Sequence, residues 1–355
     1  MARALDDYRL LGRSGLRVSP LSLGTLTFGA GEGLGSSDDE AQRILDRYME
    51  LGGNFLDTAN CYGNYGGSET TLGKVMAGRR QKLVVATKYS LTTRPGDPNA
   101  SGNHRKSMVR SVEDSLRRMG TDYIDLLYLH VWDYRTPVEE ILRAFDDLVR
   151  SGKILYAGMS DAPAWQISRM QAIADLRGWS PFVALQIPYN LIERDVEREL
   201  IPMAREMELG VLPWSPLAGG ILSGKYQMSD ACEGGLPMTR LPETRKEYNQ
   251  ATGKLSTRNL GVAQAVSRIA SEVGATPAQV ALAWTMLDPV VVSPLIGARN
   301  LAQLDDNLGA LAVELEPGHV SQLNSLAPVE MGFPHNLLNS DQIAMQFGGI
   351  KAEVR

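Results

Sequence analysis

Short apolar runs alternate with amphipathic segments from one end of the chain to the other. The runs are rich in Val, Ile, Leu and Ala and show no alternation of apolar and polar positions, which is typical of strands buried on both faces of a parallel sheet. We expect eight such strands, at Leu21–Leu23, Phe55–Asp57, Leu83–Thr87, Ile124–Leu129, Tyr156–Ser160, Val183–Ile187, Val211–Trp214 and Val290–Leu295.

The segments between these runs carry helix signals. Ser37–Glu40, Thr136–Glu139 and Thr276–Gln279 each match the capping-box pattern, and the second and third also place a proline at the first turn. The apolar positions of 138–149 recur at i, i+3, i+4 and i+7, as on the buried face of a helix. The pattern therefore predicts strands that alternate with helices along the whole chain.

Eight strands, each followed by a helix, predict an α/β fold of the (β/α)₈ barrel type, in one domain over residues 1–355. The alternative is an open, doubly wound sheet. Such a sheet would carry G-x-G-x-x-G directly between its first strand and a helix, and the glycines of Gly29–Gly35 do not open directly into one.

Three segments interrupt the alternation. Tyr8–Val18 is expected to form an N-terminal β-hairpin that plugs the bottom of the barrel. Gln227–Thr257 is a long polar loop after the seventh strand, of a length that usually marks a lid or binding loop at the carboxyl-terminal rim. The segment 328–355 has no periodicity but is apolar enough to serve as a cover.

Composition and charge exclude several function classes. Lys and Arg number 36 against 41 Asp and Glu, and no basic run is present, so neither nucleic acid nor a membrane surface is an expected partner. No apolar stretch reaches membrane-spanning length, and the N-terminus lacks the apolar block of a signal peptide. Two cysteines cannot build a disulfide framework, and no Cys or His spacing suits a metal. We expect a cytoplasmic protein without a metal, and the oligomeric state stays open.

Titratable residues stand where predicted strands end. Asp57 ends the second strand, Tyr62 follows in its loop, Lys88 follows the third strand and His130 the fourth. In a barrel these ends meet at one rim. A lysine ammonium beside a tyrosine lowers the phenol pKa, an aspartate keeps that lysine charged, and a histidine can donate to a carbonyl oxygen. The set predicts a site that protonates an oxygen while a hydride arrives at carbon.

Eight sequence blocks stand in order along the chain, at Gly24–Gly29, Asn54–Gly63, Thr87–Tyr89, Asp122–His130, Gly158–Asp161, Leu185–Leu191, Trp214–Gly220 and Ile296–Leu308. Through these blocks the sequence resembles the aldo-keto reductases over nearly the whole chain. The pair S-D-A-P-A-W and W-S-P-L-A-G-G is most like the aryl-alcohol dehydrogenase-like branch of that family.

The resemblance implies NADP(H)-dependent, reversible reduction of an aldehyde or ketone to an alcohol. It makes Tyr62 the general acid/base, tuned by Lys88 and Asp57, while His130 orients the substrate carbonyl. Two other functions stay open. One is a cofactor-bound regulatory subunit resembling the potassium-channel β-subunits. The other is a phosphate-binding isomerase or aldolase in which Lys88 forms a Schiff base.

The resemblance also implies a cofactor site. Ser160 and Gln186 would hold the nicotinamide carboxamide, Trp214 would stack on the ring, the Ser215–Gly219 backbone would wrap the pyrophosphate, and Arg299 would meet the 2′-phosphate. The implied cofactor residues are Gly24, Thr25, Leu26, Asp57, Ser160, Asp161, Gln186, Trp214, Ser215, Pro216, Leu217, Ala218, Gly219, Lys225, Gly297, Arg299, Gln303, Asp306 and Asn307.

Two departures and a substrate wall complete the expectations. Asp161 stands where many relatives have asparagine. Gly297 stands where many have lysine, so that NAD(H) remains an alternative to NADP(H). Phe28, Tyr89 and Trp132 would frame the pocket over the nicotinamide and favour an apolar or aromatic small-molecule carbonyl or alcohol.

Overall fold

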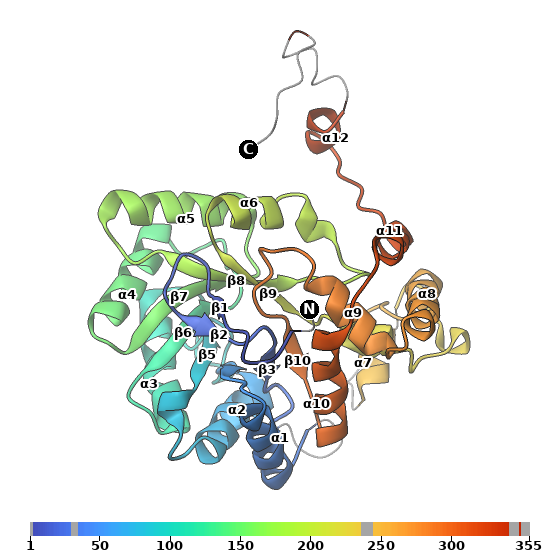
Figure 1. Cartoon of the computed structure of the whole chain (residues 1–355). Helices are drawn as coiled ribbons and strands as arrows, with labels where there is room; N and C mark the ends of the chain where they lie inside the picture. Colours follow the sequence, from blue (N-terminus) through green and yellow to red (C-terminus); the bar gives the residue numbers. More distant parts are fainter. Residues whose placement is uncertain (1–2, 30–34, 236–243, 341–347, 349–355) are drawn as a thin grey trace.

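The computed structural model describes residues 3–29, 35–235, 244–340 and 348, and it confirms the (β/α)₈ barrel (Figure 1). Eight parallel strands form one sheet in the order β10-β3-β4-β5-β6-β7-β8-β9. An isolated bridge between Val211 and Val291 lies where β9 meets the chain that leads to β10. The strands are β3 Ser22–Gly24, β4 Phe55–Asp57, β5 Val84–Tyr89, β6 Ile124–Leu129, β7 Ile154–Ser160, β8 Phe182–Pro188, β9 Gly210–Trp214 and β10 Leu295–Gly297.

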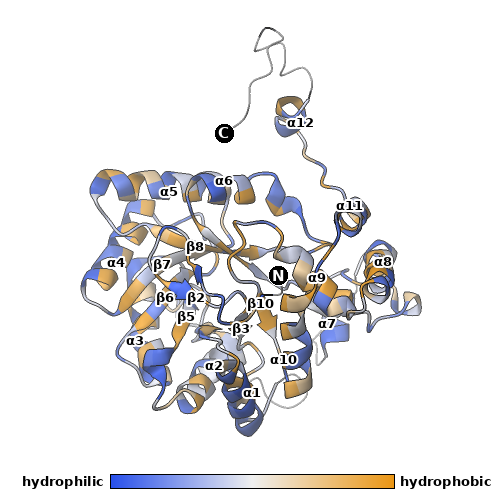
Figure 2. Ribbon diagram, in the orientation of Figure 1, coloured by the Kyte–Doolittle hydropathy of each residue, from blue (hydrophilic) through white to orange (hydrophobic). Residues whose placement is uncertain are grey.

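Helices surround this sheet, and Figure 2 shows polar residues gathered on their outer faces. The barrel helices thus bury their apolar stripe against the strands, as amphipathic helices do. They are α1 Asp38–Glu50, α2 Tyr62–Val75, α3 Arg105–Met119, α4 Val138–Arg150, α5 Ala164–Arg177, α6 Leu200–Glu206, α7 Arg245–Ala251, α8 Thr257–Glu272, α9 Pro277–Thr285, α10 Leu301–Leu308, α11 Pro317–Leu326 and α12 His335–Leu338.

The helix starts are as predicted in two of three cases. The Ser37 hydroxyl accepts from the Glu40 amide before α1, and Thr276 and Gln279 cap each other's backbone before α9. The third prediction is wrong by one residue, because α4 is capped at Pro137 while the Thr136 hydroxyl donates instead to Asp133.

The last strand also differs from its prediction. The sequence placed it at Val290–Leu295, but β10 begins at Leu295. Val290 and Val292 instead exchange backbone hydrogen bonds with Val211 of β9, at 2.9 Å each. This stretch therefore joins β9 to β10 rather than extending β10.

The N-terminal hairpin covers the amino end of the barrel, as predicted. Its strands are β1 Arg9–Leu10 and β2 Arg17–Val18, paired antiparallel. Leu11 is fully buried among the apolar residues that fill this end of the barrel. Gly12 has φ +52°, and a Cβ there would lie 2.1 Å from the Val183 carbonyl oxygen, so the close approach requires glycine.

The C-terminal segment does not cover the barrel in its described part. In Figure 1, α12 lies away from the sheet, and Phe333 beside it is 82% exposed. Residues 341–347 and 349–355 of the expected cover segment lie outside the described residues. Among the helices described, none is long and apolar enough to span a membrane.

Candidate active site

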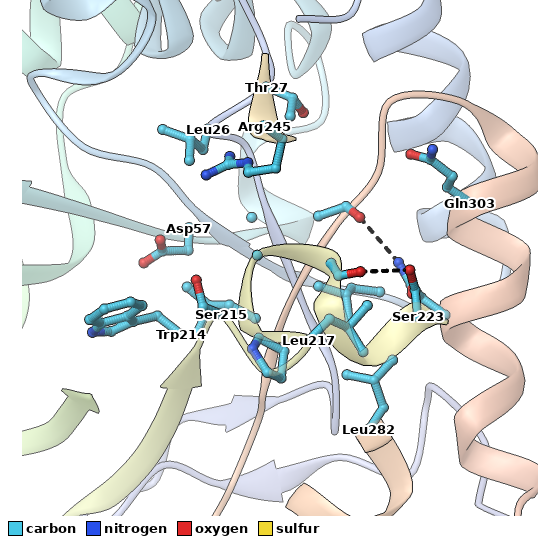
Figure 3. A pocket seen from close by; sticks show the side chains of 18 of the residues that line it. Leu26, Thr27, Asp57, Trp214, Ser215, Leu217, Ser223, Arg245, Leu282 and Gln303 are labelled. Atoms are coloured by element: carbon cyan, nitrogen blue, oxygen red, sulfur yellow. Dashed lines mark hydrogen bonds between the residues drawn. The ribbon is translucent and has the colours of Figure 1, made fainter. Parts of the chain in front are cut away.

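A cavity of about 720 Å³ opens at the carboxyl ends of the strands. It draws residues from the loops after β3, β4, β6, β7, β9 and β10 and from β8 itself, so segments far apart in sequence converge there. Figure 3 shows Leu26 and Thr27 on one side of it and Trp214 and Leu217 on another. The implied cofactor residues that line it are Gly24, Leu26, Asp57, Ser160, Asp161, Gln186, Trp214, Ser215, Pro216, Leu217, Gly219, Lys225, Gly297, Arg299, Gln303, Asp306 and Asn307.

Two implied cofactor residues do not line the cavity. Thr25 is fully buried, and its hydroxyl donates to the Asp57 carbonyl at 3.0 Å. Ala218 is buried in the core beside the lining residue Leu217. Both side chains therefore support the wall from behind.

The floor of the cavity holds a buried ion pair. The Lys88 Nζ lies 2.5 Å from Asp57 Oδ1 and donates to the Thr58 carbonyl at 2.7 Å, and the lysine side chain is fully buried. The second carboxylate oxygen of Asp57 accepts from Gln186 Nε2 at 2.8 Å. Because a buried charge is costly unless it is paired, these contacts fix both side chains in place.

Tyr62 and His130 stand directly over this pair. The Lys88 Nζ is 4.9 Å from the centroid of the Tyr62 ring, and the His130 ring meets the Tyr62 ring edge-on at 5.9 Å. The structure thus brings all four predicted catalytic side chains into one cluster. Three of them line the cavity, and Lys88 lies behind them.

The direction of the Tyr62 pKa shift differs from the sequence expectation. Burial raises the pKa of Tyr62 above its usual value of 10.0, and the charge of Lys88 only opposes that rise. The expected net lowering is therefore wrong, because desolvation of the phenolate outweighs the ammonium. Tyr62 holds its proton at neutral pH.

Lys88 and His130 differ in charge, because one is protonated and the other is neutral. Burial lowers the pKa of Lys88, but Asp57 and Tyr62 outweigh it, and the net pKa lies above 10.5. Burial and the positive charge of Lys88 lower the pKa of His130 from 6.5 to about 3. Lys88 is thus an ammonium and His130 a neutral imidazole, and the pKa of Asp57 is raised by burial against the pull of Lys88.

Polar contacts also order the side of the cavity formed by β7, β8 and β9. The Trp214 Nε1 donates to Asp161 Oδ1 at 3.1 Å, and the Ser160 hydroxyl donates to the Gln186 carbonyl at 2.9 Å. Asp161 thereby anchors the indole. Burial raises the pKa of Asp161, and the bond from Trp214 opposes this rise.

Basic residues gather at the outer end of the same cavity. Lys225, Arg245, Lys254 and Arg299 all line it, and within the described parts of the chain none of them forms an ion pair with a carboxylate. The pKa of Lys225 is lowered by partial burial and by the charges of Arg299 and Arg245. Unpaired cations that repel one another form a site for an anion such as a phosphate.

Arg245, Tyr248 and Lys254 are among the lining residues that the sequence reasoning missed. They lie in or just after α7, inside the segment predicted as a long polar lid or binding loop without named site residues. Of this segment, 236–243 lie outside the described residues. The buried Asn249 ties α7 down by donating to the Gly219 carbonyl at 3.1 Å. No charge signal in the sequence indicates them, because segment 227–257 holds four basic and four acidic residues. The other missed lining residues are Thr27, Gly220, Ser223, Ala278, Leu282, Leu295 and Ile296.

The glycine-rich segment beneath α7 packs so closely against its neighbours that side chains would not fit there. Gly219 and Gly220 have φ of +68° and +86°, and a Cβ on Gly219 would lie 2.6 Å from Asn249 Oδ1. Backbone amides and cations at one end, with the Trp214 indole toward the other, are the donors and the flat apolar face that a phosphorylated dinucleotide requires. The residues present fit such a cofactor.

None of the three predicted substrate-wall residues lines the cavity, and two of them are core residues instead. Phe28 and Tyr89 are fully buried in the main core, and the Tyr89 hydroxyl donates to the Asn103 carbonyl. Neither lines the cavity, because each side chain turns into the packing between strands and helices. Trp132 is 7% exposed and meets Tyr134 edge-on, with ring centroids 6.3 Å apart.

A (β/α)₈ barrel whose cavity holds Tyr62 over a buried Lys–Asp pair, together with a group of cations, is the framework of a carbonyl oxidoreductase. Comparison with known proteins defines the family. The chain belongs to the Aldo/keto reductase family, whose model matches residues 20–328. It is therefore an oxidoreductase enzyme.

Several relatives match over most of their length. A putative aryl-alcohol dehydrogenase of Saccharomyces cerevisiae is 37% identical, covering 95% of this chain and 91% of that protein. An NADP⁺ aryl-alcohol dehydrogenase of Phanerodontia chrysosporium is 36% identical, covering 91% and 86%. A norsolorinic acid reductase of Emericella nidulans is 36% identical, covering 93% and 84%. The resemblance to the aryl-alcohol dehydrogenase branch is confirmed.

Proposed function

We propose that the protein reversibly reduces an aldehyde or ketone to an alcohol with NADPH, and that Tyr62 is its general acid/base. The observation that carries the proposal is the arrangement of Tyr62 over the buried Lys88–Asp57 pair, at the floor of a cavity that ends in unpaired cations. A hydride donor that carries phosphates would enter at the cations and reach the tyrosine.

The four floor residues would divide the chemistry. When bound, the cofactor supplies the hydride that adds to the carbonyl carbon. The neutral His130 donates a hydrogen bond that orients the carbonyl oxygen, and the Tyr62 hydroxyl gives that oxygen its proton. The ammonium of Lys88 stabilises the resulting phenolate, which takes the proton back when the alcohol is oxidised.

The cofactor would lie along the cavity. Trp214 would offer a flat face to the nicotinamide, the Ser215–Gly219 backbone would hold the pyrophosphate, and Arg299, Lys225 and Arg245 would donate hydrogen bonds to the 2′-phosphate. These three cations compensate for Gly297, where many relatives carry lysine. NADPH is therefore the proposed cofactor, and NADH the weaker alternative.

The proposed substrate is a carbonyl compound with an apolar or aromatic body. Leu26 at the cavity is 44% exposed. Trp132 and Tyr134 stand two and four residues beyond His130 on the same loop, between β6 and α4. The names of the aryl-alcohol dehydrogenase relatives are consistent with this class. A Schiff-base role is disfavoured, because the ion pair with Asp57 keeps Lys88 protonated. The cytoplasmic location stays a prediction.

The test is an absorbance assay of NADPH and NADH consumption with a panel of aromatic and aliphatic aldehydes. We expect turnover that is faster with NADPH and fastest with aromatic aldehydes. Tight NADPH binding without turnover of any substrate would favour the regulatory-subunit alternative. Trapping of a substrate on Lys88 by borohydride would favour the aldolase alternative.

A further inference from the structure

The backbone directly after Tyr62 is left-handed for a full turn. Gly63, Asn64, Tyr65 and Gly66 have φ of 64°, 57°, 67° and 116°. Residues with side chains rarely adopt this conformation, because Cβ crowds the following carbonyl, and such geometry persists only where the surroundings impose it. Something must therefore hold this turn, and with it Tyr62, against relaxation.

The holding contacts come from the first regular turn of α2. The Glu69 carboxylate is fully buried and accepts from Arg118 Nε at 2.7 Å and from the Thr87 hydroxyl at 2.6 Å. Thr87 immediately precedes Lys88 on β5. One carboxylate thus links the helix that begins at Tyr62 to the strand that carries Lys88.

The guanidinium side of this pair covers the left-handed turn itself. A Cβ added to Gly66 would lie 2.6 Å from both Cδ and Nε of Arg118, so this side chain packs directly on the turn. Arg118 belongs to α3 and is mostly buried. Removal of the carboxylate would leave the guanidinium with the 3.3 Å bond to the Ser115 hydroxyl but without its ion pair, and would free the turn beneath it.

We propose that Glu69 is a positioning residue for Tyr62. Through its contacts with Arg118 and Thr87, Glu69 sets the distance between the Tyr62 phenol and Lys88. The inference rests on the proposed function, in which Tyr62 is the acid/base. It adds a residue that touches neither substrate nor cofactor but that governs how well the proton donor is aligned. Small misplacements of reacting groups are costly to rate.

The barrel offers a matched control at the other end of β5. The Asp125 carboxylate is also buried, accepts from Arg80 Nη2 at 2.6 Å and accepts from the Val85 amide at 2.9 Å. It joins the same strand to an arginine, but at the amino end of the barrel, away from Tyr62. Asp125→Asn therefore removes an equivalent ion pair without touching the left-handed turn.

The experiment compares Glu69→Gln with Asp125→Asn in the full chain. We expect Glu69→Gln to lower kcat roughly tenfold to a hundredfold, as for a reacting group displaced by about 1 Å, to shift the alkaline limb of the pH profile and to leave the Kd for NADPH within about twofold. Asp125→Asn should lower the unfolding midpoint without these changes. Equal effects of the two variants on kcat and on the pH profile would overturn the proposal.

A second readout does not depend on turnover. Amide hydrogen exchange over residues 62–67 should be faster in Glu69→Gln than in the wild type, and unchanged in Asp125→Asn. If the wild type reduces no carbonyl, the proposed function fails while this exchange still decides whether Glu69 holds the turn. Unchanged exchange in Glu69→Gln overturns the inference. If Glu69→Gln does not fold, Thr87→Val is tested in its place. This variant removes one of the donors to Glu69, and kcat, the pH profile and the amide exchange should change in the same directions.

Discussion

The two ends of the cavity hold charge in opposite ways. At the floor, Lys88 and Asp57 are buried and paired at 2.5 Å. At the outer end, Lys225, Arg245 and Arg299 are partly exposed and, in the described chain, unpaired. A buried charge needs an oppositely charged partner within the folded chain. An exposed charge is solvated by water and can pair with a charged group of a ligand when the ligand binds.

The difference separates proton chemistry from binding. The floor fixes protonation states, since Tyr62 keeps its proton, Lys88 its charge and His130 its neutrality. The outer end fixes no proton and presents only positive charge. Substitutions at the floor should therefore change rate with little change in cofactor affinity, and substitutions at the outer end should do the reverse.

The largest expected effect comes from Tyr62→Phe. It removes the proposed proton donor and keeps the ring that contacts His130 and Lys88, so kcat should fall by roughly the 10²–10⁴-fold that acid/base catalysis supplies. The Kd for NADPH, measured by fluorescence titration, should be unchanged. Activity within about threefold of the wild type would mean that another group protonates the oxygen.

Arg299→Ala should weaken cofactor binding at the outer end of the cavity without changing the floor. Loss of a charged hydrogen bond to the 2′-phosphate should weaken NADPH by about 1.5–3 kcal/mol and leave NADH nearly unchanged. Both Kd values are measured by the same titration, with Arg245→Ala as the companion variant. Added salt should weaken NADPH in the wild type, because exposed charges are screened. Equal losses for the two cofactors would assign Arg299 to another part of the dinucleotide.

The folded barrel rather than local sequence supplies the charge states of the floor. The positions of Asp57, Tyr62, Lys88 and His130 at strand ends follow from apolar patterning, and the structure clusters them as predicted. The direction of the Tyr62 pKa shift does not follow from the apolar patterning, because it depends on burial that sequence neighbours do not specify.

Loops and rim aromatics show the same limit. The polar segment 227–257 is recognisable from sequence, but the placement of Arg245 over the cavity depends on the contact of Asn249 with Gly219. Phe28 and Tyr89 are predicted in the substrate wall because they follow the first and third predicted strands at the rim, yet each side chain turns into the core. Strand-end position fixes which rim a residue joins, not which way its side chain points.

The neutrality of His130 predicts a pH-dependent stability. Its pKa is about 3 in the folded chain and 6.5 unperturbed, so between these values the unfolded state binds more protons and stability falls as pH falls. From pH 7 to 5 the loss from this group is about 2 kcal/mol. His130→Asn, which cannot titrate, should flatten the urea-midpoint curve in that range. An unchanged slope would place the histidine in a more solvated setting.

The smallest effect is expected at the rim. Trp132 is almost fully buried beneath Tyr134, which is 71% exposed, and the two rings meet edge-on. Trp132 would thus act on a substrate by holding Tyr134 in place. We expect Trp132→Ala and Tyr134→Ala each to raise KM for an aromatic aldehyde by roughly twofold to tenfold, the 0.5–1.5 kcal/mol of an aromatic contact, and to leave KM for a small aliphatic aldehyde unchanged. The comparison is made in one assay series with both substrates. A variant that changes both KM values alike would make the aromatic pair a packing element, and the apolar wall would then have to come from Leu26 on the opposite loop.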